Sequence, residues 1–545
     1  MAGAVSTGGS KLKRRFRVLA LAAMLGGAMP VLAEATPEQL RQIDALFARW
    51  NGSTSPGCAI SVVHRGTTVA ERVYGMADLD LAVPARIDSV YEAGSTSKQF
   101  TAAAILLLAR DGRLGLDDDI RKYLPEMPIY SARLTIRHLL HHVSGLRDWG
   151  GVAAVEGWPR DSRTVSNVDV LAIAARQKAL NFAPGSHYLY SNTNYNLLAI
   201  IVQRASGQTL AAFTKARIFT PLGMSETRWR DDHLAIVPRR AHAYAREGGV
   251  YVIGQPIEDA YGNGGLLTTV RDLQIWNAAL DADRLGPGFA AAMEEQIAFP
   301  GGGKLAYAAG LFKLTHHGQP EIGHPGATGG YRAWLGRYPT HRVSIALLCN
   351  AGDADTRALA RSVADIFLPP YRAPVVAQAQ VRRPEGVYAN SVSGFPVWFG
   401  NVNGRLSIGG QVLDVVGPGQ WRIGTGVYAF DTRQQLTLET EEGDRIAYHK
   451  AKWTAPAGAA VYAGRYCSVD TSGCWSVKPF GSGIAVTPAR AGEIRLDPAY
   501  GDVFTLANGS MIRFLRAPTG QVSGFSYSDP RDYDMRFMRV APGRP

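Results

Sequence analysis

Long hydrophobic runs are missing from this 545-residue sequence, and beyond residue 17 so is any cluster of basic residues. The apolar stretch at 18–33 is interrupted by Gly26, Gly27 and Pro30, so it is too short and too broken to favour a stable membrane span. The basic residues that follow it are dispersed and form no stripe, which argues against a nucleic-acid partner. We therefore expect no integral membrane span and no nucleic-acid binding.

The N-terminal segment has the pattern of a secretory signal peptide. Five basic residues precede the apolar stretch, and the small-residue sequence VLA ends it before Glu34. The formal net charge falls from +12 to +7 when these five cations are removed, and no cysteine follows the stretch to carry a lipid. We expect residues 1–33 to be cleaved after Ala33 and the mature chain to be periplasmic or secreted.

Cysteine is scarce, with four residues in the whole chain. Cys467 and Cys474 have a spacing that suits the two arms of a hairpin, so a disulfide between them is predicted in an oxidising compartment. Cys58 and Cys349 lie inside apolar, strand-like runs and are expected to be core residues. No cluster of histidine, cysteine and aspartate suggests a metal, so neither a metal nor another cofactor is expected.

The composition predicts a folded chain of several domains. Hydrophobic residues make up 46% and charged residues 19%, which is typical of globular proteins, and the length exceeds that of one ordinary core. Strand-like segments at 57–75 and 331–349 enclose helical segments, which indicates one α/β domain. Beyond it the chain is turn-rich and alternating, as in antiparallel sheets.

The C-terminal part repeats itself weakly. The segments that begin at Glu385 and Ala463 share a Gly-x-Tyr opening, a turn, an aromatic strand, a second glycine turn and an apolar strand. Two small antiparallel β-barrel domains are the simplest interpretation. The predicted domains are a catalytic α/β domain at 34–370, a proline-punctuated linker at 371–383, a first barrel at 384–458 and a second barrel at 459–545.

The segment EAGSTSKQFTAAAILLLAR at 92–110 places a lysine at the start of an apolar run. Apolar residues on every side of the helix predicted from Thr96 to Ala109 indicate burial, where a charge is costly. Lys98 could still reach water with its flexible side chain, and Ser95 could simply cap the helix. Alternatively, residues three apart share a helix face, so Lys98 could accept the proton of Ser95 if burial keeps its amine neutral.

Two further polar pairs carry candidate chemistry. Tyr190 and Asn192 precede a helix, and His324 and Gly326 are predicted to open a strand. Pro325 has no N–H, so this strand fits only at a sheet edge or cleft. The same residue types recur at the same spacing elsewhere in the sequence, as Ser10 with Lys13, Tyr388 with Asn390, Tyr261 with Asn263, and His316 with Gly318.

In their order along the chain, the motifs GSTSKQFTAA, PGSHYLYSNTNYNLLA and GHPGATGGYRAWL resemble those of the serine β-lactamase and penicillin-binding-protein family. The segments LTIRHLLHHVSGLRDW and GNGGLLTTVRDLQIW look like its connecting segments, and the resemblance covers roughly residues 36–366. It implies an α/β sandwich with an antiparallel sheet and an all-helical lobe. It also implies that Ser95 attacks a carbonyl, that Lys98 and Tyr190 share the proton transfers, and that Asn192 positions substrate and lysine.

The resemblance implies two further features of the site. The backbone N–H groups of Ser95 and of Ala327, which follows Gly326, would form the oxyanion hole. His324 would stand where many relatives have the lysine of Lys-Thr-Gly. A histidine there is similar to the esterase-like and D-aminopeptidase-like branches, so strong binding of a substrate carboxylate is not expected.

Within this family the sequence is most similar to bacterial D-aminopeptidases, which likewise join the catalytic domain to two C-terminal β-barrels. There a long loop of the last barrel reaches into the active site, whereas the equivalent turn here, within 505–514, is short, so we expect the cleft to be open to longer peptides or esters. We predict a secreted serine hydrolase for small amides or peptides that contain D-amino acids. The alternatives are a carboxylesterase or weak β-lactamase, and a non-catalytic envelope-binding protein. The oligomeric state is not predicted.

Overall fold

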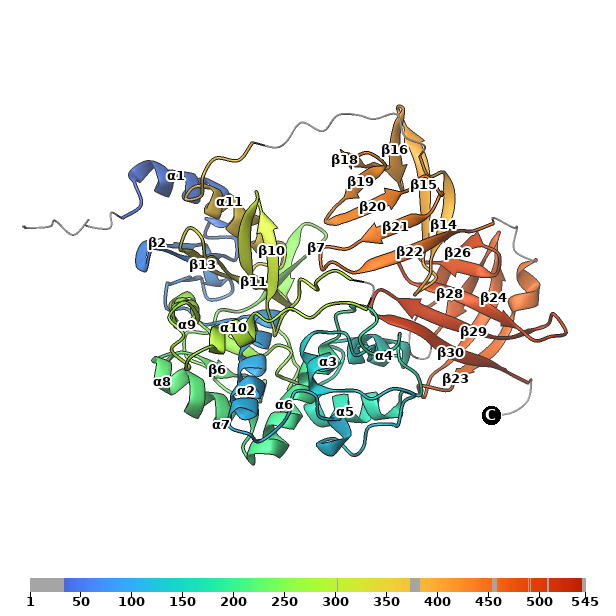
Figure 1. Ribbon diagram of the computed structural model, residues 1–545, viewed down its shortest axis with the longest axis horizontal. Helices are drawn as coiled ribbons and strands as arrows, with labels where there is room; N and C mark the ends of the chain where they lie inside the picture. The colour runs from blue at the N-terminus through green and yellow to red at the C-terminus, as the bar shows by residue number, and fades with distance from the viewer. Residues whose placement is uncertain are drawn as a thin grey trace, which may run out of the picture.

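The computed structural model shows a mixed α/β unit followed by two β units (Figure 1). It describes residues 34–300, 302–372, 383–452, 458–488, 490, 492–506 and 509–541. The predicted signal peptide and most of the predicted linker at 371–383 lie outside these residues. In this part of the chain, no helix is long and apolar enough to cross a membrane.

The α/β unit is built on an antiparallel sheet of six strands among the described residues. The first and last strands of the unit meet at its centre, because β1 pairs with β13 from Cys58↔Cys349 to His64↔Val343. This confirms the α/β prediction from strands at both ends of the segment. In order across the sheet, the strands are β10 (Phe312–His316), β11 (Gln319–Thr328), β12 (Tyr331–Tyr338), β13 (Val343–Cys349), β1 (Cys58–His64) and β2 (Thr67–Tyr74).

Both faces of this sheet are covered, which explains why β13 is apolar at almost every position. Ile345 and Leu347 face α1 (Pro37–Leu46) and α11 (Thr356–Asp365), whereas Ala346 and Leu348 face the core that contains α9 (Val270–Asp281). Successive strand residues point to opposite faces, so a strand between two helical layers needs apolar residues throughout. The remaining small strands are β3 (Met76–Asp78), β4 (Val83–Pro84), β5 (Tyr91–Glu92), β6 (Arg228–Trp229), β7 (Tyr244–Glu247), β8 (Val250–Ile253) and β9 (Leu266–Thr268).

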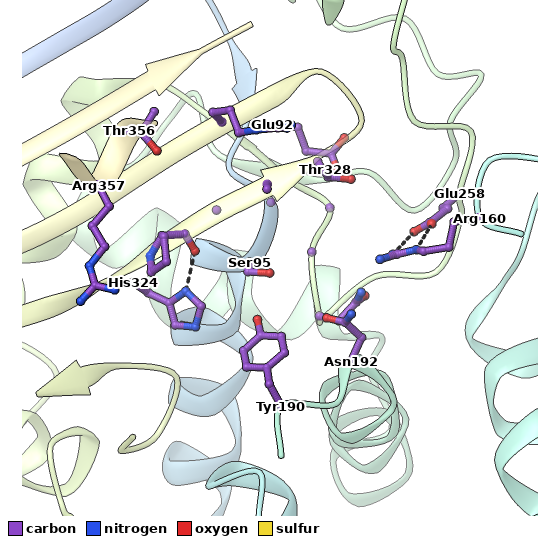
Figure 2. Close-up of a pocket in the computed structure, with 18 of the residues that line it drawn as sticks. Glu92, Ser95, Arg160, Tyr190, Asn192, Glu258, His324, Thr328, Thr356 and Arg357 are labelled. Atoms are coloured by element: carbon purple, nitrogen blue, oxygen red, sulfur yellow. Dashed lines mark hydrogen bonds and ion pairs between the residues drawn. The ribbon is translucent and has the colours of Figure 1, made fainter. Parts of the chain in front are cut away.

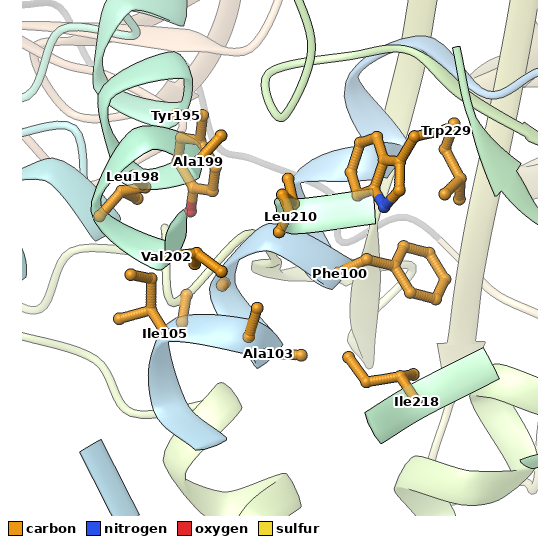
Figure 3. Close-up of a cluster of buried hydrophobic side chains, with 14 of the residues drawn as sticks. Phe100, Ala103, Ile105, Tyr195, Leu198, Ala199, Val202, Leu210, Ile218 and Trp229 are labelled. Carbon is orange, nitrogen blue, oxygen red and sulfur yellow. The ribbon is translucent and has the colours of Figure 1, made fainter. Parts of the chain in front are cut away.

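The helical lobe centres on α2 (Lys98–Arg110), which is buried from Lys98 to Leu108. Figure 3 shows Ile105 of α2 near Val202 of α6 (Asn192–Ser206), whereas Phe100 of α2 points away from α6, toward Ile218. The predicted buried helix is confirmed, although it begins two residues later than expected, after the 3-10 turn η2 (Gly94–Ser97). The other helices are α3 (Ile136–Leu140), α4 (Trp149–Val155), α5 (Asn167–Arg176), α7 (Leu210–Thr214), α8 (Thr220–Leu222) and α10 (Phe289–Met293).

Strand β11 differs from the predicted strand in where it begins. It starts at Gln319, so His324 and Gly326 lie in its second half and do not open it. Its first half pairs with β10 as far as Gly323, and beyond that residue β12 is its only partner among the strands that the structure describes. Pro325 therefore lies on a free edge, which confirms the prediction made from its missing N–H.

The C-terminal region contains two antiparallel β units, as the repeat predicted. The second is a closed barrel of β23 to β30. The first is a nine-stranded sheet among the described residues, whose outermost strands β17 and β18 do not pair with each other. The first unit consists of β14 (Gly386–Asn390), β15 (Pro396–Val402), β16 (Arg405–Ile408), β17 (Gln411–Val412), β18 (Asp414–Gly417), β19 (Gln420–Ile423), β20 (Gly426–Phe430), β21 (Leu436–Glu439) and β22 (Arg445–Lys450). The second consists of β23 (Gly464–Ser468), β24 (Cys474–Phe480), β25 (Gly483–Thr487), β26 (Ile494–Tyr500), β27 (Val503–Thr505), β28 (Met511–Arg516), β29 (Val522–Asp529) and β30 (Asp532–Val540).

The closed barrel docks on the helical lobe through an apolar core and buried polar contacts. Trp149 and Val152 of α4 belong to the same buried cluster as Trp475 and Phe525 of the barrel. At the edge of this cluster, the Arg147 guanidinium donates to the backbone oxygens of residues 533 and 534 of the barrel, each at 3.1 Å. The closed barrel therefore packs directly against the helical lobe.

Both pairs of cysteines form disulfides. The Cys467–Cys474 bridge joins β23 to β24 and confirms the prediction. Cys58 and Cys349 are buried core residues, as expected, but they are also bonded to each other across β1 and β13, a disulfide that the sequence did not predict. They are 291 positions apart in the sequence, so no local pattern could show that their strands are neighbours.

Replacing Cys58 and Cys349 together by alanine is expected to lower the free energy of unfolding of the α/β unit by about 4–5 kcal/mol, because this bridge closes a very long loop. Removing the Cys467–Cys474 pair in the same way should cost its barrel only about 2–3 kcal/mol, since the closed loop is short. Differential scanning calorimetry of the two variants measures both losses. An equal or smaller loss in the Cys58/Cys349 variant would contradict this ranking.

Candidate active site

A cavity of about 570 Å³ lies where η2, β11, the helical lobe and both β units meet. Its lining includes Ser95, Tyr190, Asn192 and His324, four residues that the sequence motifs singled out. Figure 2 shows the side chains of Ser95, Tyr190 and Asn192 converging on one point, with His324 on one side. The structure thus brings together residues that three separate motifs supplied.

The amino group of Lys98 is enclosed behind three residues that line this cavity. Its Nζ donates to Ser95 Oγ at 3.2 Å, to Asn192 Oδ1 at 3.0 Å and to the backbone oxygen of Asn263 at 2.5 Å. The side chain is fully buried, so it does not extend to water. Ser95 does not cap α2, because it lies inside η2 and α2 begins after Ser97 without a side-chain cap. Both simpler explanations for this pair are therefore excluded.

The surroundings of Lys98 favour a neutral amine. Burial is the largest influence and lowers the pKa of Lys98 well below its usual value, and the positive charge of Arg531 lowers it further. The carboxylate of Asp148 opposes these effects and Arg160 adds to them. Since a neutral amine can accept a proton, this environment suits a general base.

Asn192 is held in place by Asp148 at the start of α4. Asp148 Oδ2 accepts from the backbone N–H of Asn192 at 2.7 Å and from its Nδ2 at 2.9 Å, which turns Oδ1 toward Lys98. Burial would raise the pKa of Asp148, but Arg531, Arg160 and these hydrogen bonds outweigh it and lower the pKa. An ionised Asp148 thus fixes the orientation of the amide.

Tyr190 directs its hydroxyl toward Ser95 (Figure 2). This hydroxyl is buried and has no hydrogen-bond partner among the described residues. Burial raises the pKa of Tyr190 above its usual value, although the neighbouring Ser95 hydroxyl acts in the opposite direction. Tyr190 is therefore a neutral phenol that can donate its proton to an incoming group.

His324 is a buried, neutral imidazole. Its Nδ1 lies 2.6 Å from the backbone oxygen of Pro325, which assigns the proton to Nδ1, and its Nε2 then accepts from the Tyr307 hydroxyl at 3.2 Å. Burial lowers the pKa of His324 to about 3, and protonation of the neighbouring Lys98 would lower it further. His324 supplies no positive charge to the cavity.

Glycines let the edge of β11 approach the start of η2. A Cβ on Gly326 would lie 2.0 Å from the backbone oxygen of Ala93, and a Cβ on Gly94 would lie 2.6 Å from the nitrogen of Ala327. Gly94 also has a φ of +50°, a conformation that side chains disfavour. Substitution at either position would push Ala327 away from Ser95, whose backbone nitrogens are the predicted oxyanion donors.

Charged residues that the sequence motifs did not reveal complete the lining. Three arginines are each held by a carboxylate in bidentate pairs, Arg160 with Glu258, Arg230 with Glu92 and Arg357 with Glu441. Glu442, in the turn between β21 and β22, and Arg531, in the turn between β29 and β30, come from the two β units. These residues belong to no local motif, so only the folded chain could place them at the site.

The last barrel contributes Arg531 to the cavity lining from a turn outside 505–514, and the expectation of a cleft open to longer peptides or esters stays a prediction. The turn between β27 and β28 is short, as expected. A different turn of the same barrel reaches the site instead, and its Arg531 guanidinium lies 5.3 Å from the centre of the Tyr190 ring. The closed barrel therefore places a positive charge over the ring of Tyr190, whose hydroxyl points toward Ser95.

Comparison with known sequences gives concordant matches. The family model described as Beta-lactamase matches residues 43–367. Penicillin-binding protein 4* of Bacillus subtilis is 32% identical over 311 residues, which cover 52% of this chain and 66% of that protein. D-aminopeptidase of Gluconobacter oxydans is 27% identical over 64% of each chain, and D-aminopeptidase of Brucella canis is 26% identical over 76% of this chain and 79% of that protein. The alignments thus span about two thirds of the first two relatives.

Solved structures show the same fold. An octameric penicillin-binding protein homologue from Pyrococcus abyssi matches 92% of this chain and 99% of its own, with a TM-score of 0.53 and 19% identity. D-amino acid amidase from Ochrobactrum anthropi in complex with D-phenylalanine matches 60% of this chain and 98% of its own, with a TM-score of 0.52 and 22% identity. At these identities the likeness concerns the fold alone.

Proposed function

The chain belongs to the β-lactamase family, and from this premise we propose that it is a serine hydrolase in which Ser95 becomes acylated. The observation that carries the proposal is the buried Lys98 amine, whose Nζ lies 3.2 Å from Ser95 Oγ and whose pKa is lowered. A serine hydroxyl is a weak nucleophile until a nearby base takes its proton. Its position beside Ser95 and its lowered pKa suit Lys98 to be that base.

The proposed reaction has two steps. Lys98 accepts the proton of Ser95 while Oγ bonds to the substrate carbonyl carbon, and the N–H groups of Ser95 and Ala327 stabilise the oxyanion. The bond from this carbon to the leaving nitrogen then breaks as Tyr190 donates its proton to that nitrogen and regains one from Lys98. Water hydrolyses the acyl-serine in the second step by the same proton transfers in reverse.

We propose that the substrates are small amides or peptides of D-amino acids. Support comes from the relatives named D-aminopeptidase and the fold neighbour named D-amino acid amidase. The neutral His324 lines the cavity where a lysine would supply positive charge for a substrate carboxylate, which argues against strong β-lactam binding. A carboxylesterase is the second candidate, because the same neutral histidine suits an uncharged ester.

Glu442 offers a carboxyl group for the substrate's ammonium. Glu92 and Glu258 are held by arginines and Asp355 caps α11, whereas Glu442 forms no ion pair with lysine or arginine in the described part of the chain. Burial raises the pKa of Glu442 above its usual value, and an ammonium beside it would favour the ionised form. We propose that Glu442 replaces the barrel loop of the D-aminopeptidases in selecting a free amine.

The Glu442→Gln variant is expected to lose about tenfold to a hundredfold in kcat/KM toward D-alanine p-nitroanilide, because a charge-assisted hydrogen bond is removed. Activity toward the N-acetylated substrate should not change. Glu439→Gln, on the exposed face of β21, is the matched control. Equal losses on both substrates would argue that Glu442 acts through the fold and does not contact the amine.

The experiment that tests the proposed function compares D-alanine p-nitroanilide, L-alanine p-nitroanilide and p-nitrophenyl acetate, with the Ser95→Ala protein as the blank. Preferential cleavage of the D-amide is expected. Cleavage of the ester alone would support the carboxylesterase, and no cleavage of any of the three would argue for a non-catalytic binding protein.

Export also belongs to the proposal. The basic and apolar pattern of residues 1–33 supports a cleaved signal peptide, and two disulfides suit an oxidising compartment. We propose a periplasmic or secreted enzyme that requires no metal or other cofactor for this reaction.

The Arg531→Gln variant is expected to shift the acid limb of the kcat/KM profile to higher pH. Arg531 lowers the pKa of Lys98, so its removal raises that pKa, and the neutral amine then appears only at higher pH. The profile of kcat/KM against pH measures the shift. Arg536→Gln, at an exposed position of the same barrel, is the control and should leave the profile in place. An unchanged acid limb in the Arg531→Gln variant would show that Arg531 does not affect the titration of Lys98.

A further inference from the structure

The turn between β10 and β11 brings two consecutive histidines onto one side of the hairpin. His316 ends β10, and His317 and Gly318 form the two-residue turn, with φ values of +49° and +75°. Neighbouring strand residues ordinarily point to opposite faces. Here the left-handed conformation of His317 stacks its imidazole on that of His316, with ring centres 4.0 Å apart.

Both imidazoles meet the same carboxylate oxygen at the end of α11. Asp365 Oδ1 lies 2.7 Å from His316 Nε2 and 3.1 Å from His317 Nδ1. The two nitrogens and a carboxylate oxygen all lie within 4.8 Å of one another. From this convergence we propose that His316, His317 and Asp365 bind a divalent transition-metal ion, Zn²⁺ being the best match.

The charge balance of the cluster favours a cation. In the part of the chain that the structure describes, Asp365 forms no ion pair with lysine or arginine, whereas the nearby Glu321 is paired with Arg361. An imidazole that acts as a metal ligand is neutral, so the Asp365 carboxylate would be the group left to be compensated. A divalent ion bound by all three groups would compensate it.

The donor set selects the type of metal. Two imidazole nitrogens and one carboxylate suit Zn²⁺ and its neighbours, whereas Ca²⁺ and Mg²⁺ prefer oxygen ligands alone. Tetrahedral zinc with bonds of about 2.0–2.2 Å places its ligand atoms about 3.3–3.6 Å apart, so small outward rotations of the side chains would admit the ion. His317 and Asp365 are about two-fifths exposed, which leaves a position for water or another ligand.

The position of the cluster indicates what the ion would do. It would join the β10–β11 turn to the last residue of α11, at the opposite end of β11 from Pro325 and Gly326. The metal would therefore stabilise the strand that forms one edge of the cavity and would take no part in the Ser95 reaction. The site is independent of the proposed function.

Titration of tag-free protein with Zn²⁺ in a calorimeter, and with Co²⁺ followed by visible absorption, tests the proposal. We expect one ion per chain, the strong visible bands of low-coordinate Co²⁺, and a higher Tm with Zn²⁺. Asp365→Asn and His316→Gln should each weaken binding at least about tenfold. His233→Gln, in the separate group of Asp232, His233 and Asp259, is the control and should bind as the parent does.

Absence of stoichiometric binding would overturn the proposal, as would binding that survives Asp365→Asn but is lost in His233→Gln. His316 is mostly buried, so that variant could misfold. His317→Gln, at a more exposed position of the turn, then provides the equivalent test, with unchanged Ser95-dependent hydrolysis as the measure of correct folding.

Discussion

The Ser95→Ala protein is expected to lose at least about 10⁴-fold in kcat toward every substrate that the parent hydrolyses, because no other group can form the acyl intermediate. Ser95 Oγ accepts one hydrogen bond from Lys98, and its removal leaves the packing of α2 intact. The Tm should therefore change little. Steady-state rates with D-alanine p-nitroanilide and p-nitrophenyl acetate measure the loss.

Ser391→Ala, in the turn that follows β14, is a suitable control because this serine is exposed and does not line the cavity. It should retain the parent rate. Residual activity of the Ser95→Ala protein within tenfold of the parent would refute the acyl-serine scheme, since the fold would then be catalysing by another route.

The Lys98→Met protein is expected to lose about 10²-fold to 10⁴-fold in kcat/KM, the usual contribution of a positioned general base. Methionine keeps most of the volume and removes the amine. The change relieves the burial of a basic group but leaves Asn192 Oδ1 and the Asn263 oxygen without their donor. We expect these effects to oppose each other, so the Tm should move by only a few degrees.

Lys122→Met is the control, because its ammonium lies at the surface beside Asp118. It should keep full activity. A Lys98→Met protein with normal turnover and an unchanged pH profile would show that Lys98 serves the fold and not the chemistry.

The sequence was sufficient to predict the main architecture because its signals are local. Apolar residues all round the helix that carries Lys98 indicated burial, and Pro325 indicated a strand edge; the structure agrees with both. The alternating, turn-rich C-terminal part of the chain predicted two antiparallel β units for the same reason. Each of these signals depends on residues a few positions apart.

Features that depend on distant segments were missed. The disulfide between Cys58 and Cys349 was not predicted, because nothing in their own strands shows that β1 and β13 are neighbours. His316 was noted only because its spacing to Gly318 repeats that of His324 to Gly326, and Asp365, its partner, comes from another element.

The candidate site divides in the same way. Ser95 and Lys98 could be paired from the sequence, because three positions on a helix define one face. Glu442 and Arg531 could not be found, since each comes from a turn of a different β unit and only docking of these units on the α/β unit brings them to the cavity. Sequence motifs locate the reacting groups, whereas the positions of the groups proposed to select the substrate depend on how the domains pack.

Mass spectrometry of the rapidly quenched reaction with p-nitrophenyl acetate tests the central claim most directly, because it identifies the residue that carries the acyl group. We predict one acetyl group per chain during turnover, on the peptide that contains Ser95, and none in the Ser95→Ala protein. An acetyl group on another residue, or continued turnover with no acetylated chain, would contradict the proposed mechanism.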